Sequence, residues 1–281
     1  MRIDLHVHST CSDGSLAPAE LVKLAAESGV MAIALTDHDT AAGVDEAQKE
    51  GARLGVTVLP GIELSARWEG KEIHILGYCI QPDNRELARF LAVYRGKRSQ
   101  RNQKTAELLM EKGLLDSPES IKKRYPGAVI TRAHFAEYLY ETGAASSVKD
   151  AFDRWLGDGK PCCVPKEMPA WEEAIHTIRL AGGHAVLAHP WLYRMNDNRL
   201  EQMIRELVGA GLEGLEAIYT THTLSEEQKL RCLADRYGLH ITGGSDFHGS
   251  KKPDIRLGFG RGRLYVDSDV MEWLTAPQTR G

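Results

Sequence analysis

The sequence has no run of about 18 consecutive apolar residues, the length that a membrane-spanning helix requires, so we expect no membrane partner. Its first residues follow a strand-like pattern in place of the apolar stretch of a signal peptide. Cysteine is also scarce, since the chain has five, an odd number with no paired spacing. Such cysteines are typical of reduced thiols, so the sequence argues against a disulfide-stapled secreted domain and predicts a cytoplasmic protein.

A strong excess of one charge is missing as well. With 35 Lys and Arg residues against 39 Asp and Glu residues, the formal net charge is -4 at pH 7. This balance argues against an extended surface for duplex nucleic acid, but it is compatible with a local positive pocket for a small anionic substrate. The 281 residues, of which 42% are hydrophobic, can bury a full core as one large domain or two small ones.

Strand-like and helical segments alternate in the two outer parts of the chain. We expect strands at 2–9, 31–39, 56–66, 71–80, 184–190, 213–219 and 240–248, and helices at 17–29, 42–55, 168–183, 199–212 and 226–238. This alternation predicts an α/β fold with a mainly parallel sheet and crossover helices. Between the outer parts, residues 84–160 are highly charged and show helical periods without a clear strand, which predicts an inserted helical subdomain.

Side chains that can bind metal gather at or near the ends of the expected strands. They are six imidazoles and three carboxylates: His6, His8, Asp13, His38, Glu63, His74, His189, Asp246 and His248. A single histidine in a strand is usually structural, but functional groups of α/β folds lie at the carboxyl ends of strands, and six of the eleven histidines fall there. Imidazole and carboxylate suit Zn, Mn and Fe, so the pattern predicts a metal centre without thiolate ligands.

The motifs that carry these residues also resemble a known family. "DLHVHSTCSDG", "ALTDHDT", "GIELSA" followed by "HILGY", "AVLAHP" and "GSDFHG" occur in this order and are similar to the motifs of the PHP (polymerase and histidinol phosphatase) family. The resemblance covers nearly the whole chain and is strongest to stand-alone bacterial enzymes that dephosphorylate 3',5'-bisphosphonucleotides, some of whose relatives trim 5' ends of short RNAs. It implies a distorted (β/α)7 barrel formed by residues 1–83 and 161–281, with residues 84–160 as a helical insertion that contributes to the substrate pocket.

The resemblance also implies two or three divalent transition metals, which would be Mn, Zn or Fe. It places His6, His8, Glu63 and Asp246 around one ion, Glu63, His74 and His189 around a second, and Asp13, His38 and His248 around a third. Catalysis would act through Glu63, Asp246 and His248, with a hydroxide that bridges the metals attacking a phosphate monoester. Three divalent ions would outweigh the three carboxylates, and the positive excess suits a phosphate.

Three further residues resemble the substrate contacts of these nucleotidases. Arg132 and His134 belong to the motif "TRAHF" inside the insertion, and His222 follows an expected strand in "YTTHTLS". Arginine can bind phosphate through two parallel hydrogen bonds, which supports a substrate role for Arg132. The expected partner is therefore a small phosphorylated molecule, either a nucleotide or a short oligonucleotide.

Some neighbouring residues allow more than one interpretation. Asp4 and Asp37 lie just before predicted ligands, where each carboxylate could orient an imidazole or cap the following turn. Arg98 and Arg101 could line the substrate pocket, but a solvated helix face is the expected place for them. The glycines of "TGGSD" predict a close approach at the end of a strand, because no helix follows to form a dinucleotide-binding loop.

The sequence thus predicts a cytoplasmic, metal-dependent phosphoesterase that hydrolyses a phosphate monoester of a nucleotide. A 5'-3' exonuclease on short RNA or DNA is one alternative and would use the same metal site. A histidinol-phosphate phosphatase is another, although the insertion and its "TRAHF" motif argue against it. A non-catalytic metal-binding accessory module is the third, and it would show lost ligands or a fused polymerase domain, neither of which is seen.

Overall fold

The computed structural model describes residues 1–275. These residues form two compact units: Met1–Phe90 with the described residues from Met168 onward, and Leu91–Glu167. Among the described residues, no helix combines the length and the apolar character needed to cross a lipid bilayer.

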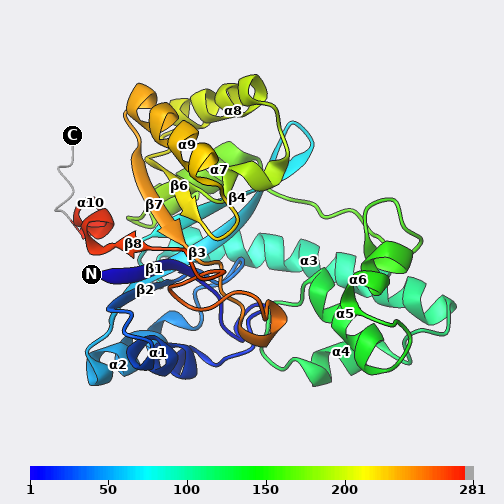
Figure 1. Cartoon of the computed structure of the whole chain (residues 1–281). Helices are drawn as coiled ribbons and strands as arrows, with labels where there is room; N and C mark the ends of the chain where they lie inside the picture. Colours follow the sequence, from blue (N-terminus) through cyan, green and yellow to red (C-terminus); the bar gives the residue numbers. More distant parts are fainter. Residues whose placement is uncertain (276–281) are drawn as a thin grey trace. The chain divides into compact units, whose positions relative to one another are not determined.

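A single curled sheet forms the centre of the first unit (Figure 1). Its strand order is β7-β6-β5-β4-β3-β2-β1-β8, with β1 (Arg2–Val7), β2 (Ala32–Leu35), β3 (Thr57–Trp68), β4 (Lys71–Tyr78), β5 (His184–Leu187), β6 (Gly214–Tyr219), β7 (His240–Gly244) and β8 (Val266–Asp267). The segment after β7 also reaches β1, because the amide of Asp246 donates to the carbonyl of His6 at 2.9 Å and the amide of His8 donates to the carbonyl of Phe247 at 2.9 Å. The sheet is therefore nearly closed, and the predicted α/β barrel is confirmed.

Strand direction differs from the prediction in the middle of the sheet. The pairs β1–β2, β2–β3, β5–β6 and β6–β7 are parallel, but β4 runs antiparallel to both β3 and β5. The reason is the two-residue turn between β3 and β4, in which Glu69 (φ 46°) and Gly70 (φ 81°) both have positive φ. Such a turn reverses the chain within a hairpin, so no crossover helix separates these two strands. The expectation of a mainly parallel sheet is wrong at this point.

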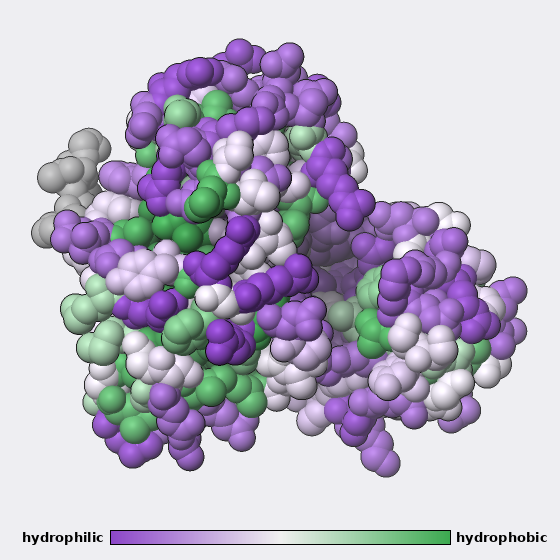
Figure 2. Space-filling view, viewed as in Figure 1, coloured by the Kyte–Doolittle hydropathy of each residue, from purple (hydrophilic) through white to green (hydrophobic). Residues whose placement is uncertain are grey.

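Amphipathic helices cover the outside of the barrel. They are α1 (Pro18–Glu27), α2 (Val44–Leu54), α7 (Trp171–Leu180), α8 (Asp197–Gly209) and α9 (Leu224–Tyr237). The short α10 (Glu272–Thr275) instead places Leu274 in the same buried cluster as Leu5 and Tyr78. In α8 the buried side chains are Leu200, Met203, Ile204 and Leu207, a spacing that faces one side of a helix. Figure 2 shows hydrophilic side chains over most of the visible surface of α8 and α9, as expected for helices with apolar inner faces.

Two clusters of buried apolar side chains contribute to the core of the first unit. Within the barrel, side chains such as Leu5, Tyr78 and Val186 form one buried cluster. A second cluster lies between the outer helices α1 and α2 and the strands they cover, with Leu21 and Ile33 among its members. Packing on both faces makes the sheet a rigid support for the loops at its edge.

The second unit is helical, as the sequence predicts. Helix α3 (Arg85–Glu111) begins in the first unit, and α4 (Pro118–Arg124), α5 (Arg132–Glu141), α6 (Val148–Ala151) and the π-helix η1 (Phe152–Leu156) follow. Residues 91–167, all of which the structure describes, contain no strand. Phe135, Leu139 and Leu156 lie in a core of their own.

Candidate metal centre

The nine predicted ligands come together at one end of the barrel. The carboxyl ends of parallel strands meet at one edge of a sheet, so the loops after β1, β2, β5 and β7 can bring side chains together there. These loops supply His8, Asp13, His38, His189, Asp246 and His248, while β1 carries His6, β3 carries Glu63 and β4 carries His74. In overlapping groups, ligand atoms lie within 4.8 Å of one another: His8, Asp13, His38 and His248; His6, Glu63 and His189; His6, His8 and Asp246; His38, Glu63 and His74.

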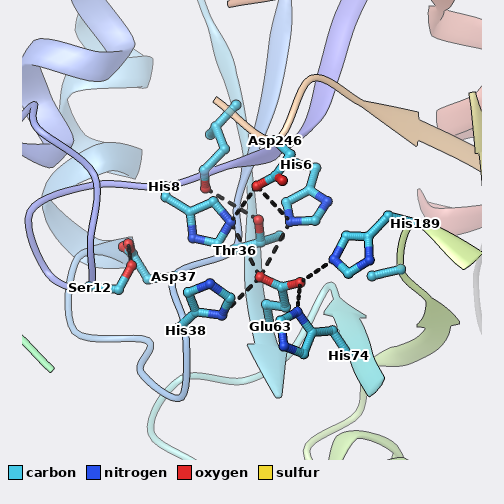
Figure 3. A network of polar contacts seen from close by, with 12 residues as sticks. His6, His8, Ser12, Thr36, Asp37, His38, Glu63, His74, His189 and Asp246 are labelled. Carbon is cyan, nitrogen blue, oxygen red and sulfur yellow. Dashed lines mark hydrogen bonds and ion pairs between the residues drawn. The ribbon is translucent and has the colours of Figure 1, made fainter. Parts of the chain in front are cut away.

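The Glu63 carboxylate lies at the centre of this arrangement and is 1% exposed. Figure 3 shows imidazoles from several loops and strands pointing toward it. Its Oε1 atom lies 2.8 Å from Nδ1 of His74 and 3.1 Å from Nε2 of His189. Its Oε2 atom lies 2.9 Å from Nδ1 of His38, 3.3 Å from Nε2 of His8 and 3.4 Å from Nε2 of His6. Each carboxylate oxygen thus faces a different set of nitrogen atoms.

The hairpin of β3 and β4 explains why Glu63 and His74 meet. Glu63 pairs with Leu76 and Ser65 pairs with His74, so Glu63 and His74 are diagonal neighbours on the same face of the sheet. His38 approaches from the other side through a parallel bridge to Glu63. His74 therefore reaches the site from the middle of an antiparallel strand, and the expectation that the candidate ligands lie at strand ends is wrong for this residue.

A second carboxylate group lies on the β1–β7 side of the site. Oδ1 of Asp246 is 3.4 Å from Nε2 of His8, 3.7 Å from Nε2 of His6 and 3.3 Å from Nδ1 of His248. The other ring nitrogen of His248, Nε2, lies 3.3 Å from Oδ1 of Asp13. His248 therefore stands between the two aspartates and links them.

Unusual backbone conformations hold some of these residues. His189 (φ 30°) and Asp246 (φ 57°) both lie in the left-handed region, which is costly for residues other than glycine. At Gly244, an added Cβ atom would lie 2.3 Å from Cβ of His6, so only glycine allows β7 to approach β1 this closely. The close approach predicted for "TGGSD" is confirmed, and it closes the barrel beside a predicted ligand.

The electrostatics of the cluster follow from burial and from charge. Burial alone would raise the pKa of Glu63, but the imidazoles of His38 and His74 hold it well below its usual range. Burial opposes protonation of His74, yet the Glu63 carboxylate raises the pKa of His74 to about 9. Burial and the neighbouring His248 both lower the pKa of His8, which lies well below the ordinary value. Carboxylates thus lie among imidazoles that partly hold protons, an arrangement in which a divalent cation can replace those protons.

Buried polar atoms without hydrogen-bond partners test whether the site fits a metal. Within the described residues, such atoms include Nε2 of His6, Nε2 of His8, Nδ1 of His38, Oδ1 of Asp13 and Oε2 of Glu63. A buried nitrogen or oxygen atom without a partner is rare in a folded protein and calls for an explanation such as an ion. Because imidazole nitrogens and carboxylate oxygens are the donors that Zn, Mn and Fe take, the residues fit a metal centre.

The carboxylates of Asp4 and Asp37 brace loops and do not orient imidazoles. Asp37 accepts hydrogen bonds from the amide and hydroxyl of Ser9 at 2.8 and 2.6 Å. It also accepts from the hydroxyl of Ser12 at 2.6 Å (Figure 3). Asp4 accepts from the amide and hydroxyl of Ser245 at 2.8 and 2.5 Å. These serines belong to segments distant in the sequence and not to the turn that follows each aspartate, and neither carboxylate contacts an imidazole ring in the described part of the chain. Both interpretations of Asp4 and Asp37 are therefore wrong.

Three further side chains, which were not among the predicted site residues, contact predicted ligands. Oε1 of Glu216 lies 2.8 Å from Nδ1 of His6. The Tyr219 hydroxyl donates to Oδ2 of Asp246 at 2.7 Å, and Nζ of Lys252 donates to the same oxygen at 2.6 Å. A signal existed for Glu216, since it is a charged residue inside the apolar strand "GLEAIY", but no comparable pattern marks Tyr219 or Lys252.

His222 is the predicted substrate residue that lies in the first unit. It is 5% exposed, and its Nδ1 donates to the carbonyl of Ala217 at 2.9 Å. Its Nε2 is buried and makes no hydrogen bond within the described residues. The ring of His222 lies 5.1 Å from the ring of Tyr219, whose hydroxyl contacts Asp246. His222 is thus connected to the metal-ligand cluster through one side chain.

The other predicted substrate residues lie in the second unit. Nη1 of Arg132 donates to Oδ1 of Asp158 at 2.8 Å, and Nδ1 of His134 accepts from a backbone amide at the start of α5 at 2.9 Å. His134 therefore helps to cap the helix that carries both residues. Arg98 and Arg101 are only 8% and 5% exposed, so the expectation of a solvated helix face is wrong for them.

Comparison with known proteins gives consistent similarities. A model of the PHP domain family matches residues 4–163. The chain is 36% identical over 272 residues to a 5'-3' exoribonuclease of Haemophilus influenzae. This alignment covers 97% of this chain and 98% of that protein. It is also 36% identical over 256 residues to a 3',5'-nucleoside bisphosphate phosphatase of Chromobacterium violaceum, covering 88% of this chain and 87% of that protein. A solved Bifidobacterium adolescentis structure, described as a metal-dependent phosphoesterase, aligns with a TM-score of 0.86 at 29% identity, over 96% of this chain and 94% of that one.

Proposed function

Because this chain belongs to the PHP domain family and is a hydrolase of phosphoric ester bonds, we propose that it releases phosphate from a nucleotide such as a 3',5'-bisphosphonucleotide. The family that its motifs resemble is thus confirmed by the comparisons. The observation that carries the proposal is the convergence of five imidazoles on the buried carboxylate of Glu63. A phosphate substrate suits this site once divalent ions outweigh its carboxylates.

The nine ligands are proposed to hold two or three divalent transition ions, which are Mn, Zn or Fe. One ion would take His6, His8, Glu63 and Asp246, a second would take Glu63, His74 and His189, and a third would take Asp13, His38 and His248. When bound, such ions polarise phosphoryl oxygens and lower the pKa of a coordinated water to about 7, which supplies a nucleophile at neutral pH. Support for Glu63 as the shared ligand comes from its two oxygens, which face different nitrogen atoms.

The protein's own groups prepare the site for this chemistry. The Tyr219 hydroxyl and the Lys252 ammonium both donate to Oδ2 of Asp246, which leaves Oδ1 directed at His6 and His8. These contacts also offset the negative charge of a buried carboxylate, because burial would otherwise raise its pKa while Lys252 holds it well below its usual value. Asp246 would thus stay anionic and in place for a cation.

Substrate contacts are proposed for three residues. His222 would face the phosphate with Nε2, since its Nδ1 hydrogen is committed to the carbonyl of Ala217. Burial lowers the pKa of His222, and a neutral ring with its hydrogen on Nδ1 has only an acceptor at Nε2. The contact with phosphate would therefore require the bound anion to bring a proton onto Nε2. Arg132 and His134 would bind a second phosphate of the nucleotide, and the motif "TRAHF" supports this assignment.

Removal of nucleotides from the 5' end of a short RNA or DNA is a second candidate function. It is favoured by the similarity to the Haemophilus influenzae protein, which is named a 5'-3' exoribonuclease. The same metal centre would serve both reactions, because each hydrolyses a phosphoric ester at a nucleotide. We further propose a cytoplasmic location, which the five free thiols support.

A product screen with added Mn²⁺, which measures both free phosphate and released mononucleotides, tests the proposal. The substrates are mononucleotides, 3',5'-bisphosphonucleotides, 5'-phosphorylated short RNAs and histidinol phosphate, each with a chelator control. We expect the highest kcat/KM for a 3',5'-bisphosphonucleotide and no release with the chelator. Release of mononucleotides from RNA at a higher kcat/KM would favour the exonuclease, and a preference for histidinol phosphate or no release at all would contradict the proposal.

A further inference from the structure

Glu216 is a fully buried carboxylate in the interior of the first unit. It lies in the middle of β6, and it is 0% exposed, so it cannot contact a substrate in solvent. Its Oε1 atom lies 2.8 Å from Nδ1 of His6, and its Oε2 atom accepts a hydrogen bond from the backbone amide of His189 at 2.7 Å. No lysine or arginine of the described chain forms an ion pair with it. Its two oxygens are thus both committed to predicted metal ligands.

The contact with His6 determines which ring nitrogen faces the site. A carboxylate can only accept, so the imidazole carries a hydrogen on Nδ1, and the neutral ring that binds a cation then has its lone pair on Nε2. This Nε2 atom is 3.4 Å from Oε2 of Glu63 and 3.7 Å from Oδ1 of Asp246. Without Glu216 the imidazole could rotate or carry its hydrogen on Nε2, and either change would remove the donor that a cation needs.

The contact with His189 acts on the backbone. His189 lies in the left-handed region with φ 30°, a conformation that persists only where its surroundings hold it. The hydrogen bond from its amide to Glu216 is one such restraint, and the ring of His189 then places Nε2 at 3.1 Å from Oε1 of Glu63. One carboxylate therefore restrains two imidazoles that face opposite oxygens of Glu63.

We propose that Glu216 is a positioning residue that aims His6 and His189 at Glu63 and so couples the two ion sites that share Glu63. This inference rests on the proposed metal-dependent function. It adds to that function, because Glu216 on β6 would determine metal affinity without being a ligand itself. It also predicts that the third site, with Asp13, His38 and His248, does not depend on Glu216.

The test is a calorimetric titration of the metal-free full-length chain with Mn²⁺ alone. An amide has one acceptor oxygen, so Glu216→Gln can satisfy only one of the two donors, while Glu216→Ala satisfies neither. We expect Glu216→Gln to weaken binding at the coupled sites about 10- to 100-fold, the usual effect of losing such a partner, and Glu216→Ala to weaken it more. The third site should keep the affinity of the unmodified protein.

Glu213→Gln is the matched control. Glu213 precedes β6 and forms the same kind of contact, with Oε2 2.7 Å from Nδ1 of His184, but His184 is not a predicted ligand. This variant should bind Mn²⁺ like the unmodified protein. Equal Mn²⁺ affinity in Glu216→Gln, Glu216→Ala and the unmodified protein would overturn the role of Glu216, whereas no Mn²⁺ binding by the unmodified protein would overturn the proposed function instead.

A second measurement avoids any folding defect of the variants. In the Zn²⁺-loaded unmodified protein, long-range ¹H–¹⁵N spectra report which ring nitrogen of each histidine carries hydrogen. We expect His6 to carry it on Nδ1. A His6 ring with hydrogen on Nε2, or with no hydrogen on Nδ1, would rule out the contact on which the inference depends.

Discussion

Replacing Glu63 by glutamine is the sharpest test of the metal centre. The change preserves shape but removes the charge and one acceptor from a side chain that five imidazoles surround. If the amide NH2 replaces Oε1, it faces His74 and His189, and if it replaces Oε2, it faces the other three. In either orientation an N–H group points at nitrogens whose lone pairs a cation needs.

The magnitude follows from the burial of this side chain. Breaking a buried ionic contact by altering one partner costs roughly 3–5 kcal/mol. If this cost falls on the metal-loaded site, then at about 1.4 kcal/mol for each tenfold change we expect kcat/KM for a 3',5'-bisphosphonucleotide to fall roughly 10²- to 4 × 10³-fold. Metal content should fall as well, because two proposed ion sites share this carboxylate.

The assay is Mn²⁺-dependent phosphate release, together with elemental analysis and circular dichroism. Glu213→Gln serves as the control, because it makes the same substitution next to an imidazole outside the metal centre. Circular dichroism should show an intact fold for both variants. A Glu63→Gln variant that is folded and keeps both turnover and metal content would refute the reasoning, because the imidazoles would then need no anion between them.

Three other predictions concern the metals, the substrate and the barrel. The purified protein should contain two or three equivalents of transition metal, and loading the metal-free protein at pH 7 should release protons, since the pKa of His74 is about 9 and a ligand must lose its proton. Elemental analysis and calorimetry in buffers of different ionisation enthalpy check this, and a metal-free protein that added Mn²⁺ leaves inactive would contradict it. Arg132→Ala should weaken turnover of a 3',5'-bisphosphonucleotide by roughly 10- to 200-fold, the scale of a lost charge-assisted hydrogen bond, and weaken turnover of an aryl phosphate much less. Equal losses on both substrates would instead place Arg132 on the reacting phosphate, and no loss on either would remove it from the site. Gly244→Ala should lower the free energy of unfolding by about 1–3 kcal/mol, because the new Cβ atom would lie 2.3 Å from Cβ of His6, whereas Gly209→Ala meets no atom within 4 Å and should be nearly neutral. Thermal unfolding of the two glycine variants compares them, and equal melting temperatures would contradict the close approach of β7 to β1.

Much of the site could be predicted because its signals are local. The spacing of His6 and His8 and of Asp246 and His248, together with the strand pattern before each, indicates where imidazoles and carboxylates will stand at strand ends. Helix ends could be predicted in the same way, since Gly55 (φ 74°) ends α2 in the left-handed conformation that glycine adopts easily. Such features depend on residues a few positions apart, so they can be recognised from the sequence alone.

Some roles of polar residues could not be predicted, because they depend on distant partners. Asp4 and Asp37 allowed two interpretations until Ser245, 241 residues from Asp4, and Ser9, 28 residues from Asp37, showed what the carboxylates contact. Arg98 was expected in solvent, yet it is buried, since helical periodicity alone does not say which face of a long polar helix is covered.

The sequence by itself determined which side chains are candidate metal ligands and which strands and loops carry them. Tertiary structure alone decided that β4 turns back as a hairpin so that His74 meets Glu63, that Gly244 closes the barrel against His6, and that Glu216 lies buried behind two ligands. The physical reason is that strand direction, closure and burial arise from contacts between segments far apart in the chain. A periodic pattern within one segment records which of its faces is apolar, but not which segment that face will meet.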